Sequence, residues 1–294
     1  MFKRLVPSSM PRRIRNDNKI SSMWTVTPKH NSKKSYQYSP VIIKLQHIPP
    51  LRTIFLFSLF LICIQGLGQT QLAEINDPDG YTNFRIDKGS NYDVKGKFQK
   101  GDLFITVPSS DDWWLVISYD NKQGYMNKSR ISLIKNLNYK EIKRVIFMSL
   151  DTLESKRQKF ESTNWDSSKI LFIDRRESLE NFELNIISQR ILKLISQQFC
   201  KYSDKELLNR FLEAIIKNSN SADEGPAWTL AECYVCNPDI VIQQILRFPK
   251  GLIEQLIGEL TFGFDNLTYQ EESKFKNFKI LKDKLETLKK NVNP

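Results

Sequence analysis

The sequence predicts a multidomain α+β protein, in which a small five-stranded β-barrel is followed by an all-α helical domain, either a bundle or an irregular α-solenoid. Three observations lead to this prediction. Residues 72–134 alternate short β-branched or aromatic runs with turn residues. Residues 138–290 place their apolar side chains at the 3.6-residue period of a helix. Residues 1–68 follow neither pattern and hold most of the net charge and one apolar run.

Residues 1–50 form a basic leader that we expect to be disordered. The 294-residue chain has a net charge of +11, but residues 1–53 contain eleven Lys and Arg and a single acid, Asp17, so only +1 belongs to the rest. The leader is rich in Ser, Asn and Pro. We expect translation to begin near Leu51, with an organellar presequence as the alternative. A nearly neutral folded part gives no support for nucleic-acid binding.

Residues 51–68 are predicted to be a signal peptide. The apolar run Ile54–Ile64 follows Arg52 and precedes the small residues of Gly66-Leu67-Gly68. It is shorter than the roughly 20 apolar residues that a membrane span requires, so we expect no stable transmembrane anchor. A buried core helix is the alternative. Cys63 lacks the small residues of a lipidation site before it, and we therefore expect a periplasmic or secreted protein.

No histidine follows residue 47, since the two histidines are His30 and His47. The predicted mature chain therefore cannot use Ser-His-Asp or Cys-His catalysis or a His-containing zinc site. We expect no catalytic residue, no metal site and no cofactor.

The predicted mature chain has three cysteines, Cys200, Cys233 and Cys236. The C-x-x-C spacing lies near the end of a helical pattern that Asn237-Pro238 stops, whereas a redox motif begins a helix after a strand. A zinc site would need further ligands. We therefore expect buried structural thiols or one disulfide that involves Cys200.

Five strands are expected after the turn Asp77-Pro78-Asp79-Gly80, in which Pro fixes φ and Gly tolerates positive φ. Each expected strand is near five residues long, and polar or glycine-containing turns separate the strands. The strands are 81–86, 94–98, 103–107, 113–119 and a short one at 125–126.

The helical domain is expected to span residues 138–290. Its first helix should bury Tyr139, Ile142, Val145, Ile146, Ser149 and Leu153, and a polar connector is expected over 154–177. Asp204 and Asp239 are expected N-caps. The later helices are predicted at 179–199, 204–217, 222–236, 239–248, 252–262 and 273–290, the last with the stripe Phe275, Phe278, Leu281, Leu285 and Leu288.

Residues 72–134 resemble the bacterial SH3-like (SH3b) domain family. The resemblance lies in Asp79-Gly80-Tyr81-Thr82-Asn83-Phe84-Arg85, Asn91–Val94, Gly101-Asp102, Asp112–Val116 and Gly124–Ile131, which occur in the family's order. The positions that carry the fold signature are Gly80, Asn83, Arg85, Gly101, Trp113, Val116 and Gly124.

The resemblance implies a small β-barrel that serves exported bacterial proteins as a targeting or binding module, sometimes for peptidoglycan peptides. Two departures concern the ligand loop: Phe84 replaces a small aliphatic residue, and Asp87-Lys88-Gly89 replaces the usual Gly-Pro. The cysteine peptidase that often accompanies such modules needs a histidine that the remaining chain lacks.

Adjacent Trp113 and Trp114 must project to opposite faces of their strand. One can fill the barrel, and the other lies on the outer face, in a groove or beneath the helical domain. The candidate ligand-binding residues form an aromatic set on the barrel. They are Tyr81, Tyr92, Trp114, Tyr119 and Tyr125.

The sequence thus predicts an exported, non-enzymatic binding or scaffolding protein whose partner is a cell-wall peptide, peptidoglycan or an envelope protein. The alternative is a carboxylate-dependent glycan-active enzyme or an enzyme accessory subunit. The acids considered for that chemistry mostly have the pattern of surface residues. They are Glu177, Glu180, Glu183, Glu224 and Glu232.

Overall fold

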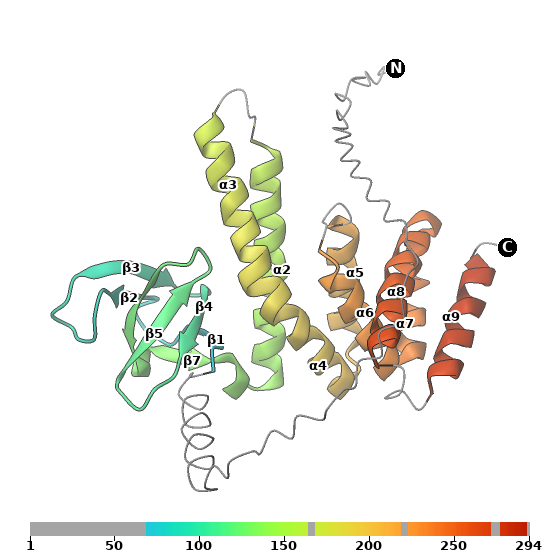
Figure 1. The fold of residues 1–294 in the computed structure, drawn as a ribbon, viewed down its shortest axis with the longest axis horizontal. Coiled ribbons are helices and arrows are strands. Elements are labelled where there is room, and N and C mark those ends of the chain that lie inside the picture. The colour runs from blue at the N-terminus through green and yellow to red at the C-terminus, as the bar shows by residue number, and fades with distance from the viewer. Residues whose placement is uncertain (1–68, 164–167, 219–222, 272–276, 293–294) are drawn as a thin grey trace, which may run out of the picture. The chain divides into compact units, whose positions relative to one another are not determined.

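A computed structural model describes residues 69–163, 168–218, 223–271 and 277–292 (Figure 1). All of them belong to one compact unit of the chain. The predicted leader, 1–50, and the predicted signal peptide, 51–68, lie outside the described residues.

The strands form one curled antiparallel sheet in the order β3-β2-β6-β5-β4-β1-β7. The five expected strands are present, but the described part of the chain contains seven, so the predicted strand count was wrong. The extra strands are β1, which precedes the expected ones and pairs with β4, and β7, which pairs with β1. With three residues, β7 is too short for an alternating pattern to be recognised. The bounds are β1 Gln71–Ile75, β2 Tyr81–Arg85, β3 Val94–Gln99, β4 Leu103–Val107, β5 Trp113–Ser118, β6 Gln123–Asn127 and β7 Ile131–Leu133.

The inside of the curled sheet is filled by aromatic rings. Phe84 lies 4.9 Å from Phe98, which stacks at 4.5 Å on Phe104. A Cβ atom at Gly96 or at Gly124 would overlap the Phe84 ring, so both positions must lack a side chain. These two glycines explain how this sheet accommodates a large residue at position 84.

The helices follow the sheet in the chain and pack directly against it. Leu72 and Leu103 of the sheet, with Ile134 after it, are buried in the same core as the helices. Two 3₁₀ turns, η1 Lys128–Arg130 and η2 Ile134–Asn136, precede the helices. The helices are α2 Tyr139–Glu161, α3 Lys169–Phe182, α4 Leu192–Tyr202, α5 Lys205–Lys217, α6 Gly225–Cys236, α7 Pro238–Ile245, α8 Lys250–Glu271 and α9 Phe278–Val292, with a π-helical segment, η3 Glu183–Ile191, between α3 and α4.

The expected polar connector at 154–177 is largely helical, so that prediction was wrong. Helix α2 extends to Glu161 and α3 begins at Lys169. Tertiary packing supports these polar turns, because Phe160 of α2 lies 4.9 Å from Phe172 of α3. The expected buried face of α2 is confirmed from Ile142 to Leu153, and Tyr139 is half-buried.

The stripe of the last helix is confirmed at Leu281, Leu285 and Leu288, whereas Phe275 lies outside the described residues. The expected N-cap at Asp239 was wrong: Asn237 caps α7 by accepting a hydrogen bond from the Ile240 amide, and Pro238 occupies the first turn.

Helix α6 is the central element of the helical region. Its Tyr234 is fully buried and donates a hydrogen bond of 2.8 Å to the Leu281 carbonyl of α9. On another side, α8 approaches so closely that a Cβ atom at Gly263 would overlap the Ala227 carbonyl of α6. Backbone therefore meets backbone at this crossing, and neither helix can move aside without losing its partner's packing.

We predict that Gly263→Val destabilises the protein by about 3 kcal/mol or more, because the branched side chain must push α8 away from α6. Gly258→Ala in the same helix is the control: a Cβ there meets no atom within 4 Å. Its higher helix propensity should leave stability unchanged or raise it by up to about 1 kcal/mol. Urea unfolding followed by far-UV circular dichroism measures both, and equal stability of the two variants would refute the close approach.

Asp204 begins α5 as a confirmed N-cap, accepting hydrogen bonds from the amides of Glu206 at 2.8 Å and Leu207 at 3.0 Å. Its other oxygen accepts from the Lys143 ammonium at 2.7 Å and from the Tyr139 hydroxyl. Burial disfavours the charged carboxylate, but the hydrogen bonds from Lys143, Tyr139 and Leu207 outweigh burial and lower the pKa of Asp204 to about 2. This network joins the start of α2 to the start of α5.

We predict that Asp204→Ala costs about 1–3 kcal/mol at pH 7. In the unfolded chain the Asp204 pKa is near 3.9, above its folded value, so this stability is present above about pH 4 and is lost as the pH falls toward 2. The difference between wild type and variant should therefore shrink over that window. Urea midpoints at pH 7, 4 and 2.5 test this, with exposed Asp283→Ala as the control, whose effect should stay below about 0.5 kcal/mol.

Candidate functional site: the aromatic face of the sheet

The outer face of the curled sheet can be read from its register. Directly paired residues of an antiparallel sheet share a face. Tyr125 of β6 pairs with Arg85 of β2 and with Leu115 of β5, and Leu115 pairs with Val107 of β4. The neighbouring positions on these strands, such as Phe84 and Met126, point into the sheet core. The four paired residues therefore form one row across the outer face.

Aromatic rings and cations lie together on this row and beside it. Tyr81 begins β2 with 44% of its surface exposed, and the Lys97 ammonium lies 4.8 Å from its ring centroid. The Lys88 ammonium lies 5.9 Å from the centroid of the Tyr125 ring. Trp113 pairs with Asn127 and is half-buried on the same face. We call Tyr81, Arg85, Lys88, Lys97, Trp113, Leu115 and Tyr125 the aromatic face.

The loop between β2 and β3 is held beside this face by Arg85. Its guanidinium donates a 2.6 Å hydrogen bond to the Tyr92 carbonyl. The Tyr92 side chain is 44% exposed. Lys88 in the same loop pairs with Asp111 of the β4–β5 loop, and its ammonium lowers the pKa of the Asp111 carboxyl. The pair remains charged into the acidic range and ties the two loops together.

Two of the five expected ligand residues lie elsewhere. Trp114 pairs with Met126 and packs against the sheet core, while its indole N–H donates to the carbonyls of Ser109 at 3.0 Å and Asp111 at 3.1 Å. It thus holds the β4–β5 loop, and Trp113, which the aromatic set omitted, is the tryptophan on the outer face. Strand alternation predicts that the two rings diverge, but only the register decides which one faces outward.

Tyr119 lies where the sheet meets the helices. Its ring packs edge-on against Phe182 at 5.5 Å, and the Lys156 ammonium lies 4.3 Å from its centroid. Lys156 also donates a 3.1 Å hydrogen bond to the Tyr119 hydroxyl. The structure therefore places Tyr81 and Tyr125 on the same face of the sheet and Tyr92 in the adjoining loop, whereas Tyr119 packs against the helices.

The remaining signature positions shape the sheet. Gly80 and Gly101 have positive φ, 76° and 94°, at the ends of turns. Val116 is fully buried, and Asn83 pairs with Lys97 on the outer face. These residues, with Gly124 packed against Phe84, form the turns and the interior beneath the face.

The acids considered for enzymatic chemistry are spread over the helical region. Glu177, Glu180 and Glu232 are exposed, whereas Glu183 and Glu224 line the same cavity. Glu183 is ion-paired with Arg157 at 3.1 Å. Within the part of the chain that the structure describes, no three His, Cys, Asp or Glu side chains gather as metal ligands, and no helix is long and apolar enough to cross a membrane.

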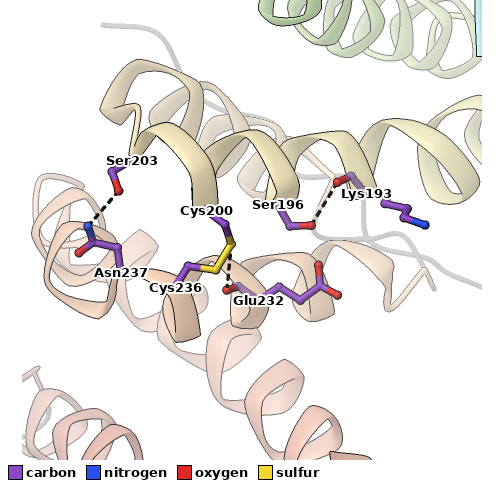
Figure 2. The surroundings of a disulfide bond; sticks show 7 residues. All are labelled: Lys193, Ser196, Cys200, Ser203, Glu232, Cys236 and Asn237. Atoms are coloured by element: carbon purple, nitrogen blue, oxygen red, sulfur yellow. Dashed lines mark hydrogen bonds between the residues drawn. A yellow bond between two sulfur atoms is a disulfide. The ribbon is translucent and has the colours of Figure 1, made fainter. Parts of the chain in front are cut away.

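Among the described cysteines, Cys200 near the end of α4 and Cys236 at the end of α6 form a disulfide (Figure 2). The Asn237 amide donates a 3.1 Å hydrogen bond to the Ser203 hydroxyl beside it, so the two helix ends are joined twice. Cys233 is buried, and burial raises the pKa of its thiol. Of the two alternatives, the disulfide that involves Cys200 is the one present.

No protein-family model matches this chain, and no curated protein matches it.

Proposed function

We propose that this chain is an exported, non-enzymatic binding or scaffolding protein that holds a cell-wall peptide or peptidoglycan strand on its aromatic face. The observation that carries the proposal is the outward placement of Tyr81, Trp113 and Tyr125 beside the cations Arg85 and Lys97. Because the face lies on paired strands, the protein backbone is already ordered, and ligand binding would cost little conformational entropy of the protein.

The chemistry of the face suits a cell-wall fragment. Aromatic side chains offer flat apolar surface to sugar rings and peptide backbones at low entropic cost. The guanidinium and ammonium groups can pair with the carboxylates of a short peptide. The ammonium groups of Lys88 and Lys97 near the rings of Tyr125 and Tyr81 add electrostatic attraction for an anionic ligand. An envelope protein that exposes such a peptide could bind to the same face and is the alternative partner.

Export is supported by two independent features. The predicted signal peptide at 51–68 leads into the folded part, and the Cys200–Cys236 disulfide is of a kind that persists in oxidising compartments such as the periplasm. The resemblance to SH3-like modules of exported bacterial proteins agrees with this.

The binding proposal predicts that the full-length protein co-sediments with purified peptidoglycan, and that Tyr81→Ala and Tyr125→Ala each weaken binding about tenfold, as loss of a central aromatic contact does. Tyr202→Ala is the matched control, because Tyr202 is equally exposed, at 44%, but lies at the end of α4. Thermal unfolding verifies that each variant is folded. Failure of the wild type to sediment, or an equal loss in Tyr202→Ala, contradicts the proposal.

The export proposal predicts a mature N-terminus between residues 66 and 72 and an intact Cys200–Cys236 bridge in protein recovered from the periplasm or medium. N-terminal peptide mapping and non-reducing mass spectrometry measure both. A mature chain that begins far from residues 66–72 is the contrary result.

A further inference from the structure

The helical region contains a cavity of about 330 Å³, separate from the aromatic face. This volume is at the lower end of the range for small-molecule sites. Its walls come from α2, η3, α4, α5, α6, α8 and the residues just before α6. Most of the wall is apolar, and the main apolar residues are Leu150, Leu153, Ile187, Phe211, Ile215 and Phe262.

The charged residues of the lining are all acidic. Glu183, Asp223, Glu224 and Glu259 line the cavity, and among the residues that the structure describes no Lys, Arg or His does. Glu183 pairs with Arg157, and Asp223 accepts hydrogen bonds from the Ser188 hydroxyl and the Gly225 amide. The cavity therefore has a negative potential that an anionic ligand would meet unfavourably.

Glu224 and Glu259 are the acids best placed to meet a ligand. Among the described residues, no cation pairs with either carboxylate, and both side chains reach solvent. Glu224 lies three residues before Ala227 on α6, and Glu259 lies four residues before Gly263 on α8. Because Ala227 and Gly263 are in direct contact, each acid lies within about one helical turn of the same crossing.

We propose that this cavity binds an organic cation with an apolar body, of the class of alkyl primary amines. Its ammonium group pairs with Glu224 and Glu259 at the rim, and its hydrocarbon body lies against Leu153, Ile187 and Phe211. Phe262, 43% exposed, also lines the cavity and adds an aromatic surface. An anion of the same body meets repulsion from the acidic side chains, and a cation without the body leaves the apolar wall in contact with water.

The test uses the full-length protein and three probes: hexylamine, hexanoate and methylamine. Two-dimensional amide NMR titration should show hexylamine binding at least tenfold more tightly than either other probe, with shifts confined to residues of the cavity. Glu224→Gln and Glu259→Gln should each weaken hexylamine binding about three- to tenfold. Glu254→Gln is the control, since Glu254 is exposed on the same helix and does not line the cavity.

Hexanoate binding as tight as hexylamine, or an equal loss in Glu254→Gln, overturns the proposal. Shifts centred on the aromatic face overturn it as well. Sedimentation with peptidoglycan should be the same in Glu259→Gln and wild type, so that failure at this cavity remains distinguishable from failure of the binding function proposed for the sheet.

Discussion

The contact on which the helical region depends is the crossing of α6 and α8 at Ala227 and Gly263, where no side chain fits between the two backbones. Helix α6 reaches α9 through Tyr234 and α4 through the Cys200–Cys236 bridge. Helix α6 thus positions α4, α8 and α9, and Gly263 sets the distance between α6 and α8. Close packing of this kind leaves few alternative arrangements, since a shift of α6 disturbs every partner together.

The same crossing explains where the cavity lies. Tight approach at Gly263 fixes the residues one turn earlier on each helix, and these include Glu224 and Glu259. The π-helical segment η3 supplies Glu183 and Ile187 to the opposite wall. π-Helical segments are uncommon and tend to occur at functional sites, because the wider turn changes the direction of the side chains. The backbone geometry of η3 and of the α6–α8 crossing therefore determines where the acidic and apolar side chains of the cavity lie.

Much of the fold could be predicted from periodicity, and the failures have identifiable physical causes. Alternation and turn residues located β2 to β6, five of the seven strands in the described residues, and the 3.6-residue period located the buried face of α2. β7 has three residues, too few for a period, and the polar end of α2 is helical because Phe160 meets Phe172 of α3. Asp239 follows a proline in the first turn, so Asn237 holds the capping position. No local pattern signals the close approach at Gly263, which only tertiary structure creates.

An aromatic surface on the sheet could be predicted from the sequence, but which aromatic residues belong to it could not. That depends on the register of the strands. Trp114 and Trp113 are equivalent in a sequence, and the pairing of Trp114 with Met126 turns it inward. Tyr119, just after the same strand, packs against Phe182 and Lys156 and does not contribute to the exposed aromatic face. The helices thus occupy one end of the outer face and leave the other to Tyr81 and Tyr125. The helices cover only part of the outer face of the sheet. Because they stabilise the sheet at that end, the aromatic side chains at the exposed end need not contribute to the stability of the fold.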